Sequence, residues 1–292
     1  VDILQTKIYK QEYIRIIGDY DVDGICASQI LKMGLKALGA KVDVAIPHRI
    51  KDGYGLSEQL VLDAFKDGVD TILTCDNGIA AASQIALAKE KGMTVVVTDH
   101  HEVPFEGEGE GKREMLPPAD AIVDPKKAQC TYPFSGICGA VVAYKLIQAL
   151  FTKLSGEEEY AVLQKNLLQF AAIATICDVM ELLDENRILV KEGLKNIRMN
   201  PMLGIEALAK VCEIDVTAIN AYHMGFVIGP CLNATGRLDT AMQALELFVA
   251  SEERDCTAIA ITLKEMNDQR KNMTEQGLEN AMRQIELGGY LD

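Results

Sequence analysis

The sequence YIRIIGDYDVDG at residues 13–24 joins an apolar run to three carboxylates at alternate positions, Asp19, Asp21 and Asp23. The β-rich run at 13–17 predicts a buried strand, which places the carboxylates at its carboxyl end. Three negative charges so close together repel one another unless cations neutralise them. Because ligands of open α/β sheets bind at the carboxyl ends of the strands, this segment predicts a ligand-binding edge.

Strand-like and helical runs alternate on both sides of this segment, as far as about residue 124. Helices between short β-rich runs indicate an α/β fold with a parallel sheet flanked by helices. The predicted strands are 13–17, 41–46, 70–74, 93–98 and 120–123. The predicted helices between them are 24–38, 56–67 and 79–91. The segment 105–115 is rich in Gly and Glu and predicts a mobile surface loop.

After residue 135 the pattern becomes helix upon helix. The predicted helices are 136–152, 158–176, 186–198, 203–211, 215–224, 239–250 and one long helix over 253–287. We therefore expect an α/β metal-binding core at 1–135 and a helical part at 136–250 that completes the site. Residues 251–292 are expected to form a long connector helix.

Acidic and imidazole side chains follow three of the predicted strands. Asp19, Asp21 and Asp23 follow the first, Asp76 follows 70–74, and Asp99-His100-His101-Glu102 follows 93–98. Strand ends of a parallel sheet share one edge, so these groups should converge. Asp178 ends a strongly apolar helix and needs a polar partner there.

The composition of this cluster indicates the kind of metal. Carboxylates with one or two imidazoles suit Mn²⁺ or Mg²⁺, whereas cysteine and histidine dominate zinc sites. The acids are numerous enough to hold two ions about 3.5–4 Å apart, an arrangement that serves in-line attack on phosphoryl groups. The residues therefore predict a two-metal phosphoesterase.

Three other interpretations fit the acidic segment less well. An EF-hand loop needs a glutamate at its twelfth position, where Ile30 stands, and a helix before it. An aspartyl-phosphate phosphatase would use Asp21 as nucleophile, but it usually has Thr where Ile25 stands and leaves Asp19 without a role. A solvated acidic turn does not explain why three strand ends carry acids.

The bulk composition limits the class of protein. The net charge of −14 argues against a nucleic-acid partner, unless metal ions or a basic partner domain offset it. Trp is absent, which leaves few residues to stack on bases. The eight cysteines form no CxxC pair and predict reduced thiols in a cytoplasmic protein. We expect no membrane association, because no apolar run is long enough to span a bilayer.

The ordered motifs GDYDVDG, CDNGI, TDHHE and ATICDV resemble those of the DHH phosphoesterase superfamily. Within it, the resemblance is closest to the RecJ family of single-strand-specific 5′→3′ exonucleases. Further RecJ-like stretches are PHRIKDGYGLS (47–57), PPADAIVDPK (117–126), YPFSGICGAVVAYKL (132–146), DENRILVKEGL (184–194) and GPCLNATGRLD (229–239). The resemblance runs from about residue 13 to the C-terminus.

The resemblance implies two metal sites that share one bridging carboxylate. The ligands of the first ion would be Asp19, Asp21 and Asp76. The ligands of the second would be Asp23, Asp76, His100 and Asp178.

The resemblance also implies roles around the metals. His101 would contact the scissile phosphate and help to protonate the leaving group, and Asp99 would orient the first histidine, His100. Arg49 and Arg237 would hold substrate phosphates, supported by Asn233.

The expected function is hydrolysis of single-stranded DNA from the 5′ end to mononucleotides, with two Mn²⁺ or Mg²⁺ ions, in DNA repair and recombination in the bacterial cytoplasm. A helicase or a single-strand-binding protein would be the protein partner. A second domain would follow the long helix. The alternatives are an enzyme for short oligonucleotides or cyclic dinucleotides, and a non-catalytic replication scaffold.

Overall fold

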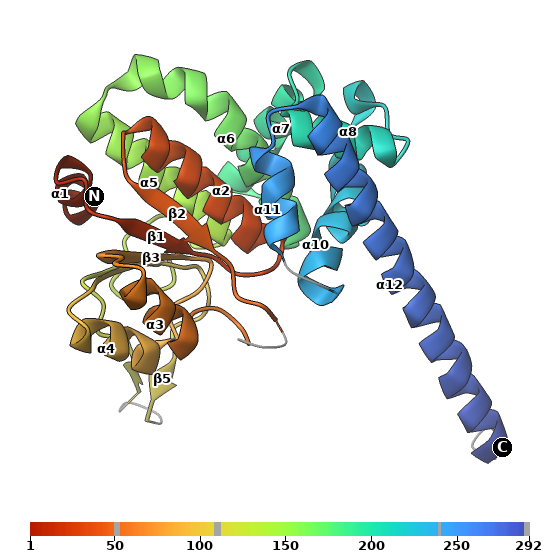
Figure 1. Ribbon diagram of the computed structural model, residues 1–292, viewed down its shortest axis with the longest axis horizontal. Coiled ribbons are helices and arrows are strands. Elements are labelled where there is room, and N and C mark those ends of the chain that lie inside the picture. The colour runs from red at the N-terminus through yellow and green to blue at the C-terminus, as the bar shows by residue number, and fades with distance from the viewer. Residues whose placement is uncertain (50–52, 108–111, 239–240, 289–292) are drawn as a thin grey trace.

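A five-stranded parallel sheet forms the centre of the computed structural model, which describes residues 1–49, 53–107, 112–238 and 241–288 (Figure 1). At residues 157, 237 and 238 only the backbone is described. The strands lie in the order β2-β1-β3-β4-β7, and each pairs in parallel with its neighbour. Their bounds are β1 (Ile14–Ile17), β2 (Val42–Ala45), β3 (Thr71–Cys75), β4 (Thr94–Thr98) and β7 (Ala121–Val123).

Both faces of the sheet are covered, which explains why its inner strands are almost continuously apolar. Successive side chains point to opposite faces. Ile16 and Leu73 belong to the larger apolar core, whereas Ile17 and Ile72 belong to the smaller one. The smaller core lies under α3 (Glu58–Lys66) and α4 (Ala82–Glu90), and the larger one under α2, α5 and α6 (Figure 1).

The three helices over the larger core carry or support the strand-end motifs. They are α2 (Val22–Ala37), α5 (Gly139–Leu154) and α6 (Glu157–Cys177). Before the sheet, α1 (Asp2–Tyr9) buries Leu4 and Ile8 in the same core.

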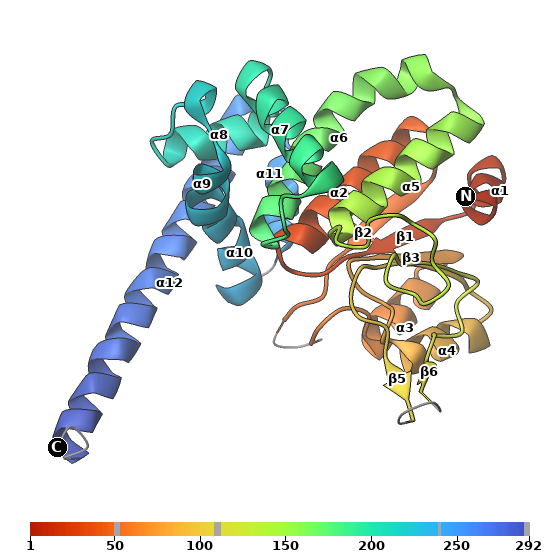
Figure 2. The ribbon, with the colours of Figure 1, turned by 180° about the vertical axis from the view of Figure 1, so that it is seen from behind.

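A second group of helices packs beside this unit (Figure 2). It consists of α7 (Asp184–Met199), α8 (Leu203–Val211), η2 (Val216–Ala218), α9 (Ala221–His223), the π-helix η3 (Met224–Ile228), α10 (Gly229–Leu238) and α11 (Met242–Val249). The last helix, α12 (Glu253–Gly288), packs on α8 and α10 at its start and then extends away from the molecule (Figures 1 and 2). No helix of the described chain is long and apolar enough to cross a membrane.

The structure confirms the α/β class, the five predicted strands and the long C-terminal helix. Two predictions need correction, and two helices were missed. The segment predicted as a loop contains a two-stranded antiparallel ribbon, β5 (Phe105–Glu106) with β6 (Arg113–Glu114), in which Arg113 pairs with Glu106; residues 108–111 lie outside the described part. The predicted helix 215–224 is divided among η2, α9 and η3. Helices α1 and α10 were not predicted.

Candidate metal centre

The acidic segment turns directly from strand β1 into helix α2. Asp21 is the N-cap residue of α2, and its Oδ1 accepts a hydrogen bond from the backbone N–H of Gly24 at 3.0 Å. Such caps satisfy N–H groups that the first helical turn leaves unpaired. A Cβ at Gly24 would lie 2.5 Å from backbone atoms of Asp19, so only glycine permits this tight turn.

The N-terminus of α5 receives the carboxylate of Asp23. Its two oxygens accept hydrogen bonds from the backbone N–H groups of Gly139 and Ala140, at 2.7 and 2.8 Å. The positive end of a helix dipole stabilises a carboxylate in this position. Gly139 is also required for space, since a Cβ there would lie 2.7 Å from the Cβ of Asp76. Helix α5 therefore fixes one acid and allows the close approach of another.

Asp76 lies at the centre of the cluster, at the end of β3. Its φ is +60°, a left-handed conformation that non-glycine residues rarely adopt, and the side chain is buried. The potential ligand atoms form three groups. Within each group the atoms lie within 4.8 Å of one another, and Asp76 belongs to two of the groups. The groups are Asp19-Asp21-Asp76, Asp23-His100-Asp178 and Asp76-His100-His101.

His100 connects these groups from the end of β4. Its Nε2 lies 3.0 Å from Asp76 Oδ1, 3.5 Å from Asp23 Oδ2 and 3.9 Å from Asp178 Oδ2. Asp178 is the C-cap residue of α6 and reaches the sheet edge from the helical side. The structure thus brings together all six residues that the sequence predicts as metal ligands.

The crowding of carboxylates has a clear electrostatic consequence. Burial and the neighbouring charge of Asp21 raise the pKa of Asp19 to about 7. Burial and Asp23 raise the pKa of Asp178 to about 7. The fully buried Asp76 has its pKa raised strongly by burial and by the surrounding aspartates. Burial lowers the pKa of His100, which favours its neutral form.

This donor set fits divalent cations. Among the described residues, the buried Asp19 Oδ1 and Asp76 Oδ1 accept no hydrogen bond, although His100 Nε2 lies 3.0 Å from Asp76 Oδ1. Buried polar atoms without partners are rare in native proteins and call for an ion or a water molecule. Carboxylate oxygens with a neutral imidazole are ligands suited to Mn²⁺ and Mg²⁺. The residues can therefore hold such ions.

His101 lies next to this cluster and is held by Asp99. Its Nδ1 lies 2.8 Å from Asp99 Oδ1, and this hydrogen bond raises the pKa of the imidazole. Burial disfavours the Asp99 carboxylate, but hydrogen bonds from His101 and from the backbone N–H groups of Ile79 and His100 lower its pKa. The pair resembles the carboxylate–histidine arrangements that fix the orientation of an imidazole. The prediction that Asp99 orients the ring of His100 is therefore wrong, because Asp99 accepts only the backbone N–H of His100 and contacts the ring of His101 instead.

Tyr54 is a site residue that sequence reasoning missed. Its hydroxyl lies 3.0 Å from His101 Nε2 and 3.2 Å from the carbonyl oxygen of Asp76. Burial and the neighbouring carboxylates raise its pKa, so it stays a neutral hydrogen-bonding group. The only signal in the sequence was its place in the motif PHRIKDGYGLS.

The three residues predicted to bind phosphate are placed differently. The guanidinium of the exposed Arg49 lies 5.3 Å from the ring centre of Tyr20, beside the acidic segment. Asn233 Oδ1 accepts a hydrogen bond from the backbone N–H of Val22 at 3.1 Å, so this side chain supports the start of α2. The side chain of Arg237 lies outside the described part of the chain.

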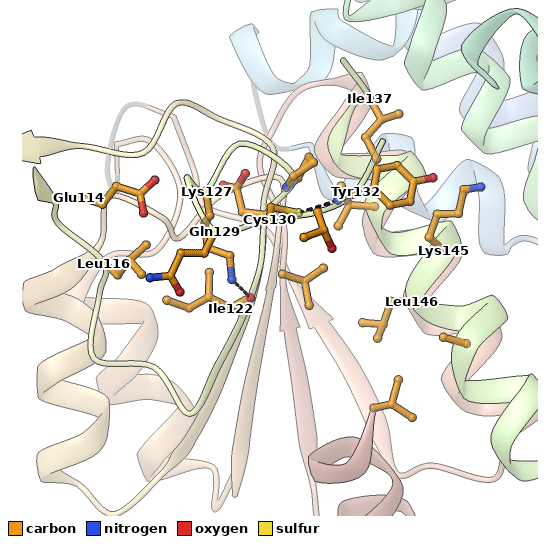
Figure 3. Close-up of a pocket in the computed structure, with 17 residues that line it drawn as sticks. Glu114, Leu116, Ile122, Lys127, Gln129, Cys130, Tyr132, Ile137, Lys145 and Leu146 are labelled. Atoms are coloured by element: carbon orange, nitrogen blue, oxygen red, sulfur yellow. Dashed lines mark hydrogen bonds between the residues drawn. The ribbon is translucent and has the colours of Figure 1, made fainter. Parts of the chain in front are cut away.

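Two cavities lie near this edge of the sheet. One of about 360 Å³ is lined by Tyr54, Asp99 and His101 and opens beside the candidate centre. A larger one, of about 640 Å³, lies between the β7 edge and α5 and contains Tyr132 and Lys145 (Figure 3). None of the six candidate metal ligands lines either cavity, but Asp99 and His101 line the smaller one, which is therefore the one next to the candidate metal centre.

Similar proteins carry informative names. The single-stranded-DNA-specific exonuclease RecJ of Bacillus subtilis is 37% identical over 288 residues, which is 99% of this chain and 34% of the relative. The RecJ of Haemophilus influenzae is 39% identical over 96% of this chain and 48% of its own length. The chain thus spans between a third and a half of the curated relatives it matches.

The solved structures agree with the sequence comparison. A crystal structure of exonuclease RecJ bound to manganese superimposes with a TM-score of 0.84 at 32% identity. The match covers 97% of this chain and 68% of that one. The model of the DHH family, N-terminal domain, matches residues 13–175, which is more than half of the chain. The chain therefore belongs to the DHH family.

Proposed function

We propose that this chain is the metal-binding part of a phosphodiesterase that removes mononucleotides from the 5′ end of single-stranded DNA. The observation that carries the proposal is the convergence of five aspartates and His100 at the sheet edge, with two buried oxygens that accept no hydrogen bond from the described residues. The names of the RecJ relatives support the substrate and the class of reaction. The 5′ polarity and the release of mononucleotides rest on the family resemblance.

The proposed ligands are those that the resemblance implies: Asp19, Asp21 and Asp76 for one ion, and Asp23, Asp76, His100 and Asp178 for the other. Two divalent ions, Mn²⁺ or Mg²⁺, would lower the pKa of the attacking water and neutralise charge on the phosphoryl oxygens. The chain itself holds these ligands rigidly, because helix α5 fixes Asp23 and the β3 end fixes Asp76.

His101 is placed to hold a proton for the leaving oxygen. Asp99 accepts from Nδ1 and raises the pKa of the ring, which leaves Nε2 as the atom that can donate. Tyr54 borders the same nitrogen and limits the positions that the ring can take. We assign His101 as the general acid and Asp99 as the residue that positions it.

Replacing Asp99 by Asn is expected to lower kcat/KM about 10- to 100-fold, as the loss of such orienting partners does. The pKa of His101 should also fall, because its charged hydrogen-bond acceptor is gone. Since the protonated ring is the active form, the loss of activity at high pH should begin at a lower pH than in the wild type. A pH profile of kcat/KM measures this shift.

The matched control is Asp120→Asn, which removes another paired carboxylate, one that binds Lys89 and the N–H of Val95 away from the site. Its pH profile should equal that of the wild type. An Asp99 variant with reduced activity and an unchanged profile would contradict the assignment.

Arg49→Ala is expected to lower kcat/KM for single-stranded DNA about 10-fold or more, mainly through KM, because a charged hydrogen bond to a phosphate is worth roughly 1.5–3 kcal/mol. Arg49→Lys should recover only part of the loss, since lysine does not bind phosphate in bidentate fashion. Arg254→Ala, at an exposed position at the start of α12, is the control. Equal kinetics for Arg49→Ala and Arg254→Ala would remove Arg49 from the substrate site.

The assay that tests the proposed function uses the 292-residue chain with Mn²⁺ and long single strands labelled at either end. Mononucleotides should be released from the 5′ end, duplex DNA should resist, and a chelator should stop the reaction. Activity on dinucleotides alone would favour the enzyme of short oligonucleotides or cyclic dinucleotides. Metal binding without hydrolysis of any substrate would favour the scaffold.

The domain division at residues 135 and 250 is part of the proposal, with α12 as the connector to a further domain. The helicase or single-strand-binding partner and the cytoplasmic location stay predictions from the resemblance.

A further inference from the structure

Two cysteines outside the metal centre lie close together. Cys212 is the C-cap residue of α8, and Cys231 lies in the first turn of α10. Their Sγ atoms are 3.9 Å apart, although 18 residues separate them in the chain. All eight cysteines are free thiols in the structure. No other pair of cysteines in the described part of the chain has a sulfur–sulfur contact recorded at this distance.

The two thiols differ in the way that a nucleophile and a resolving thiol differ. Cys231 is 1% exposed, whereas Cys212 is partly open to solvent. The hydrogen bond from Cys231 lowers the pKa of Cys212, with help from the positive charge of Lys264. Cys212 is thus the thiol that solvent reaches and that ionises first, which makes it the better nucleophile.

Asn267 of α12 completes the arrangement. Its buried side chain donates from Nδ2 to Cys231 Sγ at 3.6 Å, and its Oδ1 accepts from Arg270. The amide therefore orients the buried sulfur. A disulfide requires a sulfur separation of about 2.05 Å, so the atoms need to approach by a further ~2 Å.

We propose that Cys212 and Cys231 are a reversible oxidation site, in which a peroxide oxidises the two thiols to an intramolecular disulfide. The Cys212 thiolate attacks one peroxide oxygen, the O–O bond breaks, and hydroxide leaves, which gives a sulfenic acid. The sulfur of Cys231 then attacks the sulfur of that sulfenic acid, and its proton leaves with the hydroxyl group as water. Two electrons pass from the two thiols to one peroxide, and a dithiol reductant reverses the change.

The new bond would join the end of α8 to α10. Helix α10 also carries Asn233, which holds the N–H of Val22 beside the acidic segment. Oxidation would therefore link α10, the helix that supports the start of α2, covalently to the end of α8. This inference concerns the thiols alone and does not depend on the proposed hydrolytic activity.

The test treats the 292-residue chain with hydrogen peroxide in the presence of a chelator, blocks remaining thiols with a maleimide, and maps the peptides without reduction. One disulfide between residues 212 and 231 is expected, with the loss of two thiols per chain and recovery of both in dithiothreitol. Cys130→Ser, which removes a different partly exposed thiol, should form the same bond.

The variant Cys231→Ala should form no such bond and should leave a sulfenic acid at position 212 that dimedone captures. Cys212→Ser should protect Cys231 from oxidation. This variant tests the inference if the substitution at the buried Cys231 impairs folding. Oxidation of Cys212 in the wild type without a link to Cys231, or a disulfide between other residues, would overturn the inference.

Discussion

The variant Asp76→Asn is expected to lose metal-dependent hydrolysis by about 10²- to 10³-fold, the size of effect found when one strong electrostatic contact to the transition state is removed. Asp76 belongs to two of the three groups of ligand atoms, so its loss weakens both proposed metal sites. Asn keeps the shape of the side chain and tolerates the left-handed φ of +60° at this position. The change therefore removes a charge while the backbone stays in place.

Steady-state rates on single-stranded DNA and Mn²⁺ titration calorimetry measure the two consequences. The matched control is Asp124→Asn, another buried aspartate with an oxygen that lacks a donor, outside the three groups of ligand atoms. It should retain Mn²⁺ binding. Undiminished Mn²⁺ affinity in the Asp76 variant would reject the metal assignment.

The second large effect concerns stability without metal. In metal-free buffer, the free energy of unfolding is expected to fall as the pH rises from about 4 to about 8. Folding raises the pKa values of Asp19 and Asp178 to about 7, whereas unfolded aspartates titrate near 4. Between these values the folded chain binds more protons than the unfolded chain, so stability declines as pH increases. For Asp19 alone the loss is on the order of 4 kcal/mol.

Mn²⁺ added at pH 8 should restore part of the loss, since a ligand at 100 times its Kd stabilises by about 2.7 kcal/mol. Urea unfolding at several pH values, with and without Mn²⁺, measures the effect. Asp19→Asn should flatten the pH dependence and make the metal-free protein more stable than the wild type. Glu279 is an exposed acid on α12, so Glu279→Gln should change neither the pH dependence nor the stability of the metal-free protein. A stability that rises with pH over this range would contradict the prediction.

The metal centre could be predicted from the sequence because one rule of topology places it. The segments ending at Asp19, Asp76 and Asp99 are short β-rich runs separated by helices, and strands of that kind are parallel. Parallel strands bring their carboxyl ends to one edge, so residues far apart in the chain had to meet. Asp178 was predicted from an apolar helix that ends in an acid, and the structure places its Oδ2 3.9 Å from His100 Nε2.

Other elements escaped prediction because long-range contacts stabilise them. Helix α10 contains Gly229, Pro230 and Gly236, residues of low helical propensity, and its helix is held from outside. Asn233 binds Val22, and a Cβ at position 236 would lie 2.5 Å from the carbonyl oxygen of Tyr20. Tyr54 was not predicted as a site residue for the same reason, because no residue near it in the sequence indicates that it contacts His101.

The crowding of carboxylates around Asp76 has a consequence for the amount of this protein in a cell. A folded state that divalent ions stabilise is populated less when those ions are scarce. Chaperones and proteases act on the unfolded fraction, and a change of 1–2 kcal/mol alters abundance about several-fold. Scarcity of divalent ions would therefore reduce the number of molecules through degradation as well as the activity of each one. The carboxylates that we propose as metal ligands would then make the lifetime of the chain depend on those ions.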